Sequence, residues 1–399
     1  MPSRHAACFG RYSAFLSLLP FVSFAGVDIT TSATGEYQHN SNIFDLQAGL
    51  AVPGFPLTHR GDAFYAYGAG LGIDDQLDIQ DLYLKLAAKE LRYDYFTQLD
   101  HDEYNLDGGL KWKLGTDVDG KLDVLRTRTM VQFYNLTPSA QFSLQLPIVT
   151  EQRETASAGV GVTPDWRVEG LTYHRVVDEP LDATPHLQLT ETEGLMAVKY
   201  LGRAALTTGV SVAYLSGHYN GGTAADNPSY TQGSVDLVAD YQFTGRSDVS
   251  GELGYSRRSS AIGTNNLSGI TGKIDYHGQV TGKSTVEAVL SRTINSYIAN
   301  AGSEIDSAAS VIFNYQVTYK IGVAALYTYT NRNYPGQGAL PGTARTDRQQ
   351  DAGLKLDYEV RRWLSIKPYA TYQKRESGFV GASFNATIYG ISVIFHSID

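Results

Sequence analysis

The chain has 399 residues, which is enough for one large domain or two smaller ones. Its 27 tyrosines and 40 glycines, with only 18% charged residues, argue against a disordered chain and against a mainly helical one. The formal net charge of −9 argues against nucleic acid as a partner.

The N-terminal stretch has the pattern of a cleaved signal peptide. Arg4 and Arg11 form its basic region, and residues 12–24 form an apolar run that is too short for a membrane-spanning helix of ~20 residues. Cys8 precedes this run and leaves with the leader, so the mature chain is expected to have no disulfide. We expect residues 1–25 to be the leader and residues 26–399 to form a single domain.

Residues 81–131 define the repeating pattern of the chain. Apolar or small residues alternate with polar ones from Tyr104 to Leu114, and the segments on both sides do the same. A period of two is typical of a β-strand with one apolar face and one wet face. No later segment is apolar enough for a transmembrane helix, which leaves a secreted soluble β-protein or a membrane β-barrel.

Eighteen strands are predicted along the chain, with sixteen as the alternative count. Most are longer than a soluble strand and long enough for a tilted transmembrane strand of ~9–11 residues. The predicted ranges are 28–38, 61–73, 80–97, 102–115, 119–131, 148–163, 165–177, 186–200, 203–219, 230–243, 246–258, 267–280, 283–299, 303–319, 321–331, 347–359, 362–376 and 384–396.

The connections between these strands alternate between short and long. Pairs such as Thr281-Gly282 form tight turns, whereas segments such as 40–60 and 132–146 are long. Outer-membrane barrels alternate in this way, with short periplasmic turns and long extracellular loops. The sequence therefore predicts an all-β, antiparallel, up-and-down transmembrane β-barrel of the bacterial outer-membrane type, with both termini on the periplasmic side.

The last strand and the aromatic residues fit the same architecture. Tyr389, Ile391, Val393 and Phe395 alternate as in the C-terminal signal by which outer-membrane barrels are recognised, although four residues follow the aromatic. Aromatic side chains near strand ends are expected in girdles at the membrane interfaces rather than in a sugar-stacking platform. They are Trp166, Trp363, Tyr200, Tyr241, Phe243, Tyr319 and Tyr358.

No catalytic motif stands out, so no enzyme activity and no cofactor are predicted. The chain has no nucleophile elbow, zinc-protease helix or phosphate loop. Ser216 and His218 are close in sequence, but an exposed loop histidine is the simpler interpretation. The acidic residues at 100, 102, 103 and 107 lack the spacing of an EF-hand, so a solvated loop is expected rather than a calcium site.

The polar faces of the predicted strands should line the lumen. A barrel of this size has an aqueous interior, and charges of both signs are interspersed along the predicted wall. Such a wall suits a neutral or acidic polymer of sugars, whereas a ring of one sign would select small ions. The predicted lumen residues are Lys85, Arg92, Asp94, Asp107, Lys111, Lys113, Lys121, Asp123, Glu151, Arg153, Asp236, Asp240, Lys273, Asp275, Lys355 and Asp357.

The third of the long loops, residues 132–146, carries no acid or base. General diffusion porins instead carry acids on an inward-folded third loop. The loop is therefore interpreted as an aromatic and amide-rich segment that gates or lines a sugar path.

Residues 92–101 and 104–114 resemble the EpsL-type outer-membrane proteins of exopolysaccharide biosynthesis, in the β-barrel porin 2 group. Residues 32–44, Ser-Ala-Thr-Gly-Glu-Tyr-Gln-His-Asn-Ser-Asn-Ile-Phe, resemble the first strand of that group. The resemblance implies export of a secreted polysaccharide through the outer membrane. It also implies three kinds of partner: lipid and lipopolysaccharide around the barrel, a polysaccharide chain in the lumen, and periplasmic components of an export machine. The alternatives are a diffusion porin for small solutes or oligosaccharides, and a closed structural or adhesin barrel without transport.

Overall fold

A computed structural model describes residues 27–50, 59–131, 133, 146, 148–179, 187–202, 205–220, 229–260, 266–297, 302–335, 345–379 and 381–397. The predicted leader lies outside these residues. Within them, no helix is long and apolar enough to cross a membrane. The only helical element among them is a single 3₁₀ turn, Thr97–Leu99.

The rest of the described chain is built from eighteen strands. They are β1 (Val27–Asn40), β2 (Asp62–Leu77), β3 (Gln80–Tyr93), β4 (His101–Leu114), β5 (Val118–Met130), β6 (Ile148–Thr163), β7 (Trp166–Glu179), β8 (Leu187–Leu201), β9 (Leu206–Asn220), β10 (Ser229–Thr244), β11 (Ser247–Ser260), β12 (Leu267–Thr281), β13 (Ser284–Tyr297), β14 (Gly302–Thr318), β15 (Ile321–Tyr334), β16 (Arg345–Arg361), β17 (Leu364–Ser377) and β18 (Phe384–His396).

The sheet closes on itself. Each strand pairs antiparallel with its neighbours in sequence, and β1 also pairs with β18 from Ser32↔His396 to Asn40↔Ile388. Closure removes the unpaired strand edges that a bilayer does not tolerate. The predicted up-and-down barrel and its count of eighteen strands are confirmed, and the bounds of β6 and β18 match the predicted ones.

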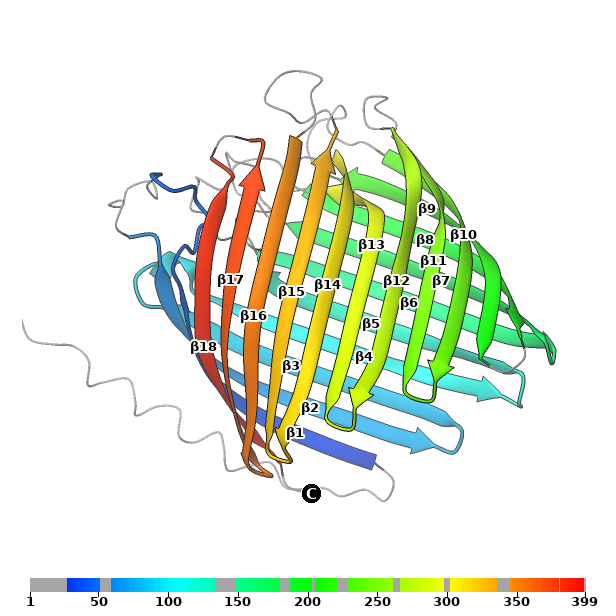
Figure 1. Ribbon diagram of the computed structural model, residues 1–399, viewed down its shortest axis with the longest axis horizontal. Coiled ribbons are helices and arrows are strands. Elements are labelled where there is room, and N and C mark those ends of the chain that lie inside the picture. The colour runs from blue at the N-terminus through cyan, green and yellow to red at the C-terminus, as the bar shows by residue number, and fades with distance from the viewer. Residues whose placement is uncertain are drawn as a thin grey trace, which may run out of the picture.

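Short and long connections lie at opposite ends of the barrel. In Figure 1 the hairpin turns, such as β12–β13 and β14–β15, lie at the lower end, and the opposite ends of these strands lie at the upper end. The first strand begins and the last strand ends at the short-turn end, since Ser32 pairs with His396. This arrangement is the one expected of an outer-membrane barrel with periplasmic termini.

The outer face carries an apolar belt. Leu237, Ile270 and Leu354 are 60–66% exposed, as expected for side chains that contact lipid rather than a protein core. All seven aromatic residues predicted for girdles are exposed at the short-turn end of this face. Trp166 packs against Tyr200 there, with ring centroids 5.2 Å apart.

The inner face is identified by contacts that cross the barrel. Glu191 of β8 and Ser296 of β13 are hydrogen-bonded, although β9 to β12 separate their strands in the sheet. Such a contact can form only through the lumen. Starting from Glu191, the register then assigns the faces of the strands on either side of β8, because directly paired residues of an antiparallel sheet point to the same side.

Candidate functional site in the barrel lumen

The segment that follows β1, residues 41–50, folds against the inner wall at the long-loop end. Phe44 is fully buried there, and its ring centroid lies 4.8 Å from that of Phe96 and 4.7 Å from that of Phe133. The cluster also includes Phe64 and Tyr93, which are inward-facing residues of β2 and β3. We call residues 41–50 the first-loop segment.

Polar contacts fix the first-loop segment in place. The Asn42 side chain donates to the carbonyls of Leu46 and of Asn385 on β18, at 2.9 and 3.0 Å. The Arg60 guanidinium donates to the carbonyls of Leu46 and Gln47, the latter at 3.1 Å. These contacts satisfy backbone carbonyls that no strand partner can reach. The segment therefore joins the closing seam of the barrel to its inner wall.

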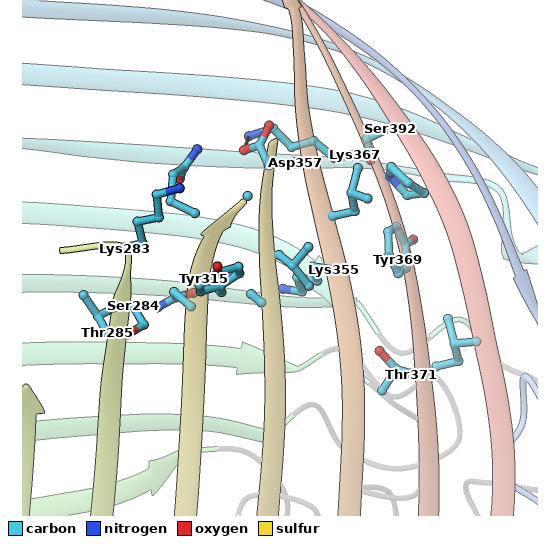
Figure 2. Close-up of a pocket in the computed structure, with 18 of the residues that line it drawn as sticks. Lys283, Ser284, Thr285, Tyr315, Lys355, Asp357, Lys367, Tyr369, Thr371 and Ser392 are labelled. Atoms are coloured by element: carbon cyan, nitrogen blue, oxygen red, sulfur yellow. Dashed lines mark hydrogen bonds and ion pairs between the residues drawn. The ribbon is translucent and has the colours of Figure 1, made fainter. Parts of the chain in front are cut away.

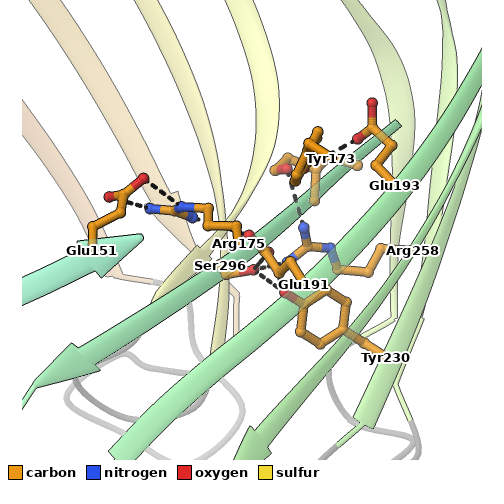
Figure 3. Close-up of polar contacts among 9 residues, drawn as sticks. Glu151, Tyr173, Arg175, Glu191, Glu193, Tyr230, Arg258 and Ser296 are labelled. Atoms are coloured by element: carbon orange, nitrogen blue, oxygen red, sulfur yellow. Dashed lines mark hydrogen bonds and ion pairs between the residues drawn. The ribbon is translucent and has the colours of Figure 1, made fainter. Parts of the chain in front are cut away.

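A polar network crosses the lumen on the other side of the long-loop end (Figure 3). Arg175 of β7 forms ion pairs with Glu151 at 2.8 Å and with Glu191 at 3.0 Å. Glu191 also accepts hydrogen bonds from the Tyr230 hydroxyl and from Ser296, the latter at 2.9 Å. Several donors on one buried carboxylate offset the cost of removing its charge from water.

Apolar groups surround this network. Val177, Leu189 and Tyr219 are almost fully buried on the inner wall, and Tyr219 packs against Tyr230 at a centroid distance of 5.8 Å. The Arg258 guanidinium stacks over the Tyr230 ring at 4.3 Å, which is a cation–π contact. The long-loop end is thus narrowed from two sides, by this group and by the first-loop segment.

Charges on the inner face from β3 to β8 are mostly paired. Lys121 lies 2.7 Å from Asp123, which also accepts a hydrogen bond from Tyr83. The ammonium groups of Lys85, Lys111 and Lys121 lie 5.5–5.9 Å from the centroid of the same Tyr83 ring.

A second group of paired charges lies closer to the short turns. Arg167 contacts Asp119 at 2.8 Å and Glu169 at 2.9 Å, and Lys199 contacts Glu169 at 2.9 Å. Pairing leaves this half of the wall wet but weakly charged.

Carboxylates dominate the inner face from β10 to β12. Asp236 and Asp240 face inward with Tyr230 by the period of two along β10, and Glu252 lies on the neighbouring strand. Two charged contacts form there among the described residues: Lys273 with Asp275 at 2.9 Å, and His277 with Asp248 at 3.5 Å. This part of the wall therefore has an excess of negative charge.

Most of the predicted lumen residues lie on the inner face. Direct pairing links Glu191 through Arg175, Arg153, Leu125 and Asp107 to Lys85. The period of two then adds Lys111, Lys113, Lys121, Asp123 and Glu151. The residues predicted on β10, β12 and β16 also face inward: Asp236, Asp240, Lys273, Asp275, Lys355 and Asp357.

Two predicted lumen residues were placed wrongly. Arg92 lies on the outer face, where it forms an ion pair with Glu90 and is half-exposed. Asp94 lies beyond the end of β3 and is exposed. The reason is the inward burial of Tyr93, because alternate residues of a strand point to opposite sides and residues 85 and 92 cannot share a face.

Strand β3 also ends earlier than predicted, at Tyr93 rather than residue 97. The Asp62 carboxylate accepts the backbone N–H groups of Tyr95 and Phe96, and Asp100 accepts that of Tyr93. These side chains replace the ladder hydrogen bonds and start the 3₁₀ turn.

Two sequence features that were expected in solvated loops lie on strands. Ser216 and His218 belong to β9, and the acidic residues 102, 103 and 107 belong to β4. His218 and Ser216 are exposed, and His218 Nδ1 lies 2.7 Å from the Ser229 hydroxyl. The described residues contain no group of three or more side chains that could hold a metal ion. In the third long loop, residues 132, 134–145 lie outside the described residues, and Phe133 joins the cluster around Phe44.

Sequence reasoning missed the first-loop segment. The signal was present as Ile43, Phe44 and Leu46, three apolar residues in a long connection that has no strand pattern. Apolar residues in a long loop indicate a packed loop rather than a solvated one.

Comparisons with known proteins agree on the kind of fold. Residues 249–397, from β11 to β18, match the model of a family described as "Putative beta-barrel porin 2". No curated protein matches the chain. The solved structure of the FrpB iron transporter from Neisseria meningitidis in its apoprotein form is similar, with a TM-score of 0.50 and 11% identity over 87% of this chain. This chain covers 61–64% of the length of the FrpB chains, so the likeness concerns the barrel alone.

Two proteins of Pseudomonas aeruginosa are also similar. A mutant of the ferric enterobactin receptor PfeA has a TM-score of 0.49 and 8% identity, covering 92% of this chain and 80% of its own. The outer membrane protein OpdK has a TM-score of 0.46 and 10% identity, covering 93% and 99%.

The closed eighteen-stranded barrel is of the outer-membrane type, and the match over residues 249–397 supports a porin-like barrel. This fold supports a location in the outer membrane and a role as a pore.

Proposed function

We propose that this chain is an outer-membrane pore through which a secreted polysaccharide leaves the cell, and that it is not an enzyme. The observation that carries the proposal is the polar inner wall of β3 to β8, where most charges are paired with one another. Paired charges keep the wall hydrated without a strong field of one sign. A hydrated polymer of sugars can slide along such a wall, whereas a small ion is not selected by it.

The narrowed long-loop end supports export more than free diffusion. The first-loop segment and the Arg175–Glu191–Tyr230 network both occupy the inner face at this end. A pore for continuous diffusion has no need of an apolar cluster inside its mouth. A pore that carries a polymer only during secretion needs its outer end closed at other times.

Deletion of the gene tests the proposal. The expected result is loss of the secreted polysaccharide from the medium, with retention of sugar polymer in the periplasm. A plasmid copy should restore secretion. Normal secretion by the deletion strain would exclude the export function.

A diffusion pore for small solutes or oligosaccharides is the alternative, and the same wall is compatible with it. Liposome swelling with purified protein distinguishes the two functions. The export function predicts slow entry of small sugars unless the first-loop segment is displaced. The diffusion function predicts rapid entry in the unaltered protein.

The periplasmic partners expected of an export machine would meet the short-turn end, where β1 begins and β18 ends. Crosslinking from a cysteine placed at Asp165, in the β6–β7 turn, should capture such a partner. Cys8 lies in the predicted leader, so after removal of the leader Asp165→Cys would supply a single reactive thiol.

A further inference from the structure

A cavity of about 930 Å³ lies in the inner wall between β12 and β18, near the short turns. Figure 2 shows Lys283 at one side of it and Lys355, Lys367 and Tyr369 on the strands beside it. The volume falls in the range of about 300–1,000 Å³ that is common for small-molecule sites. The cavity is separate from the clusters at the long-loop end.

The cavity exists because residues with small or no side chains lie between the longer side chains that line it. Gly322 and Ala324 of β15 leave the wall thin at its centre. On β18, a Cβ at Gly390 would lie 2.7 Å from Cζ of the Tyr369 ring, so glycine is required for this ring to lie against the wall. The ring remains partly exposed to the lumen.

The polar groups of the cavity lie in register. Asn314, Ala324, Lys355 and Tyr369 follow one another across four neighbouring strands. An amide, an ammonium group and an aromatic ring therefore line one row of the inner face. The row lies close to the short turns, because Lys283 belongs to the β12–β13 turn.

The charges of the cavity are only partly balanced. Asp357 is paired with Lys367 at 2.8 Å, and the Tyr369 hydroxyl lies 2.7 Å from Glu36 Oε1. Lys283 and Lys355 are exposed, and neither has a carboxylate within ion-pair distance among the described residues. Two ammonium groups are thus left for a ligand.

We propose that this cavity is an entry subsite for an acidic sugar unit, whose carboxylate lies between Lys283 and Lys355. Tyr369 packs against the C–H face of the sugar ring, and Asn314 meets its hydroxyl groups. The inference rests on the proposed export function and names the polymer as an anionic one. A polymer that arrives from the short-turn end meets this subsite first.

Other ligands fit the cavity less well. A neutral sugar would form no ion pair with either ammonium group, and an inorganic anion would not use the Tyr369 ring. The carboxylates of β10 to β12 add to the preference, because they repel an anionic chain from the neighbouring wall towards the lysines.

Binding of oligogalacturonate to the purified full chain in detergent micelles tests the inference. Maltotetraose serves as the neutral probe, and inorganic phosphate serves as the simple anion. We expect oligogalacturonate to bind most tightly, and its affinity to fall as salt is raised. The double substitution Lys283→Gln with Lys355→Gln should weaken its binding by about tenfold, from the loss of two exposed ion pairs.

Two further variants complete the test. Lys111→Gln makes the same kind of substitution, with the loss of one charge, at a lumen lysine that is already 2.7 Å from Asp81, and binding should stay as in the unaltered protein. Lys355→Arg retains the charge and should retain binding. Heat-modifiable mobility in gels checks that each variant is a folded barrel.

The inference fails if maltotetraose binds as well as oligogalacturonate, if phosphate alone binds as tightly, or if no probe binds. It also fails if the double variant binds as the unaltered protein does. These results are independent of the secretion assay. If the deletion strain secretes normally while the purified protein binds oligogalacturonate through the two lysines, export is excluded and the subsite remains. If secretion is lost but binding does not depend on the lysines, only the subsite is excluded.

Discussion

Replacing Phe44 by alanine should release the first-loop segment from the inner wall. Phe44 is 0% exposed and its ring contacts those of Phe96 and Phe133 at 4.8 and 4.7 Å. Truncation of a fully buried phenylalanine costs about 3–5 kcal/mol. Since 1.4 kcal/mol is tenfold in an equilibrium constant, the equilibrium constant for docking of the segment should fall by roughly two to four orders of magnitude.

Single-channel conductance in planar bilayers is the measurement. The variant should conduct more, or open more often, than the unaltered protein, and protease added on the long-loop side should cut within the segment. Phe313→Ala removes the same ring from the outer face, where Phe313 is 41% exposed, and should change neither quantity. Equal conductance of the Phe44 variant, with the segment proven accessible to protease, would refute the view that this segment narrows the pore.

Three other substitutions test the assignment of faces and contacts. Gly390→Ala places a Cβ 2.6 Å from the Tyr37 carbonyl and should lower the free energy of unfolding in urea by about 1–3 kcal/mol. The control Gly269→Ala meets open space and should not lower it. Equal stability of both variants would contradict the close packing at the seam. Leu237→Arg on the lipid face should make the free energy of folding into bilayers less favourable by about 2–4 kcal/mol. Asp236→Arg, at the neighbouring inward position, should have a much smaller effect. A reversed order would mean that the faces of β10 are assigned wrongly. Arg175→Met removes the cation that is paired with Glu151 and Glu191 and should destabilise the barrel by about 2–3 kcal/mol. Part of this loss should be recovered when Glu191 is also replaced by Met. No recovery would show that the Arg175–Glu191 ion pair is not what stabilises the network.

The strands could be predicted because the barrel separates two solvents. Lipid on one side and water on the other impose a period of two along each strand, so the bounds of β6 and β18 follow from the sequence alone. The end of β3 could not be predicted in this way. It depends on Asp62 and Asp100, whose carboxylates reach the backbone of residues 93–96 only after the chain has folded.

Which residues face the lumen could be predicted from odd or even position along a strand, which we call parity, but not from polarity alone. Lys85 and Arg92 are both polar residues of β3, yet an odd and an even position cannot point to the same side. Parity alone would have placed Arg92 outside. The cavity beside Lys355 was beyond sequence reasoning, because it depends on the register of β14 to β18 that brings Asn314, Ala324 and Tyr369 into one row.

Under the proposed function, the two ends of the lumen present different obstacles to a polymer that passes through the barrel. The short-turn end offers exposed ammonium groups and a partly exposed ring, so a polymer can bind there without displacing any protein group. At the long-loop end the first-loop segment packs on the inner wall in the cluster around Phe44, and under the proposed function a polymer passes when this segment leaves the cluster. A polymer can drive that change only by binding better to the open state than to the closed one. Under the proposed function, occupancy of the subsite alone would therefore not open the pore. Opening would need contacts that form once the chain reaches the inner wall that the segment now covers, chiefly the faces of Phe64 and Tyr93.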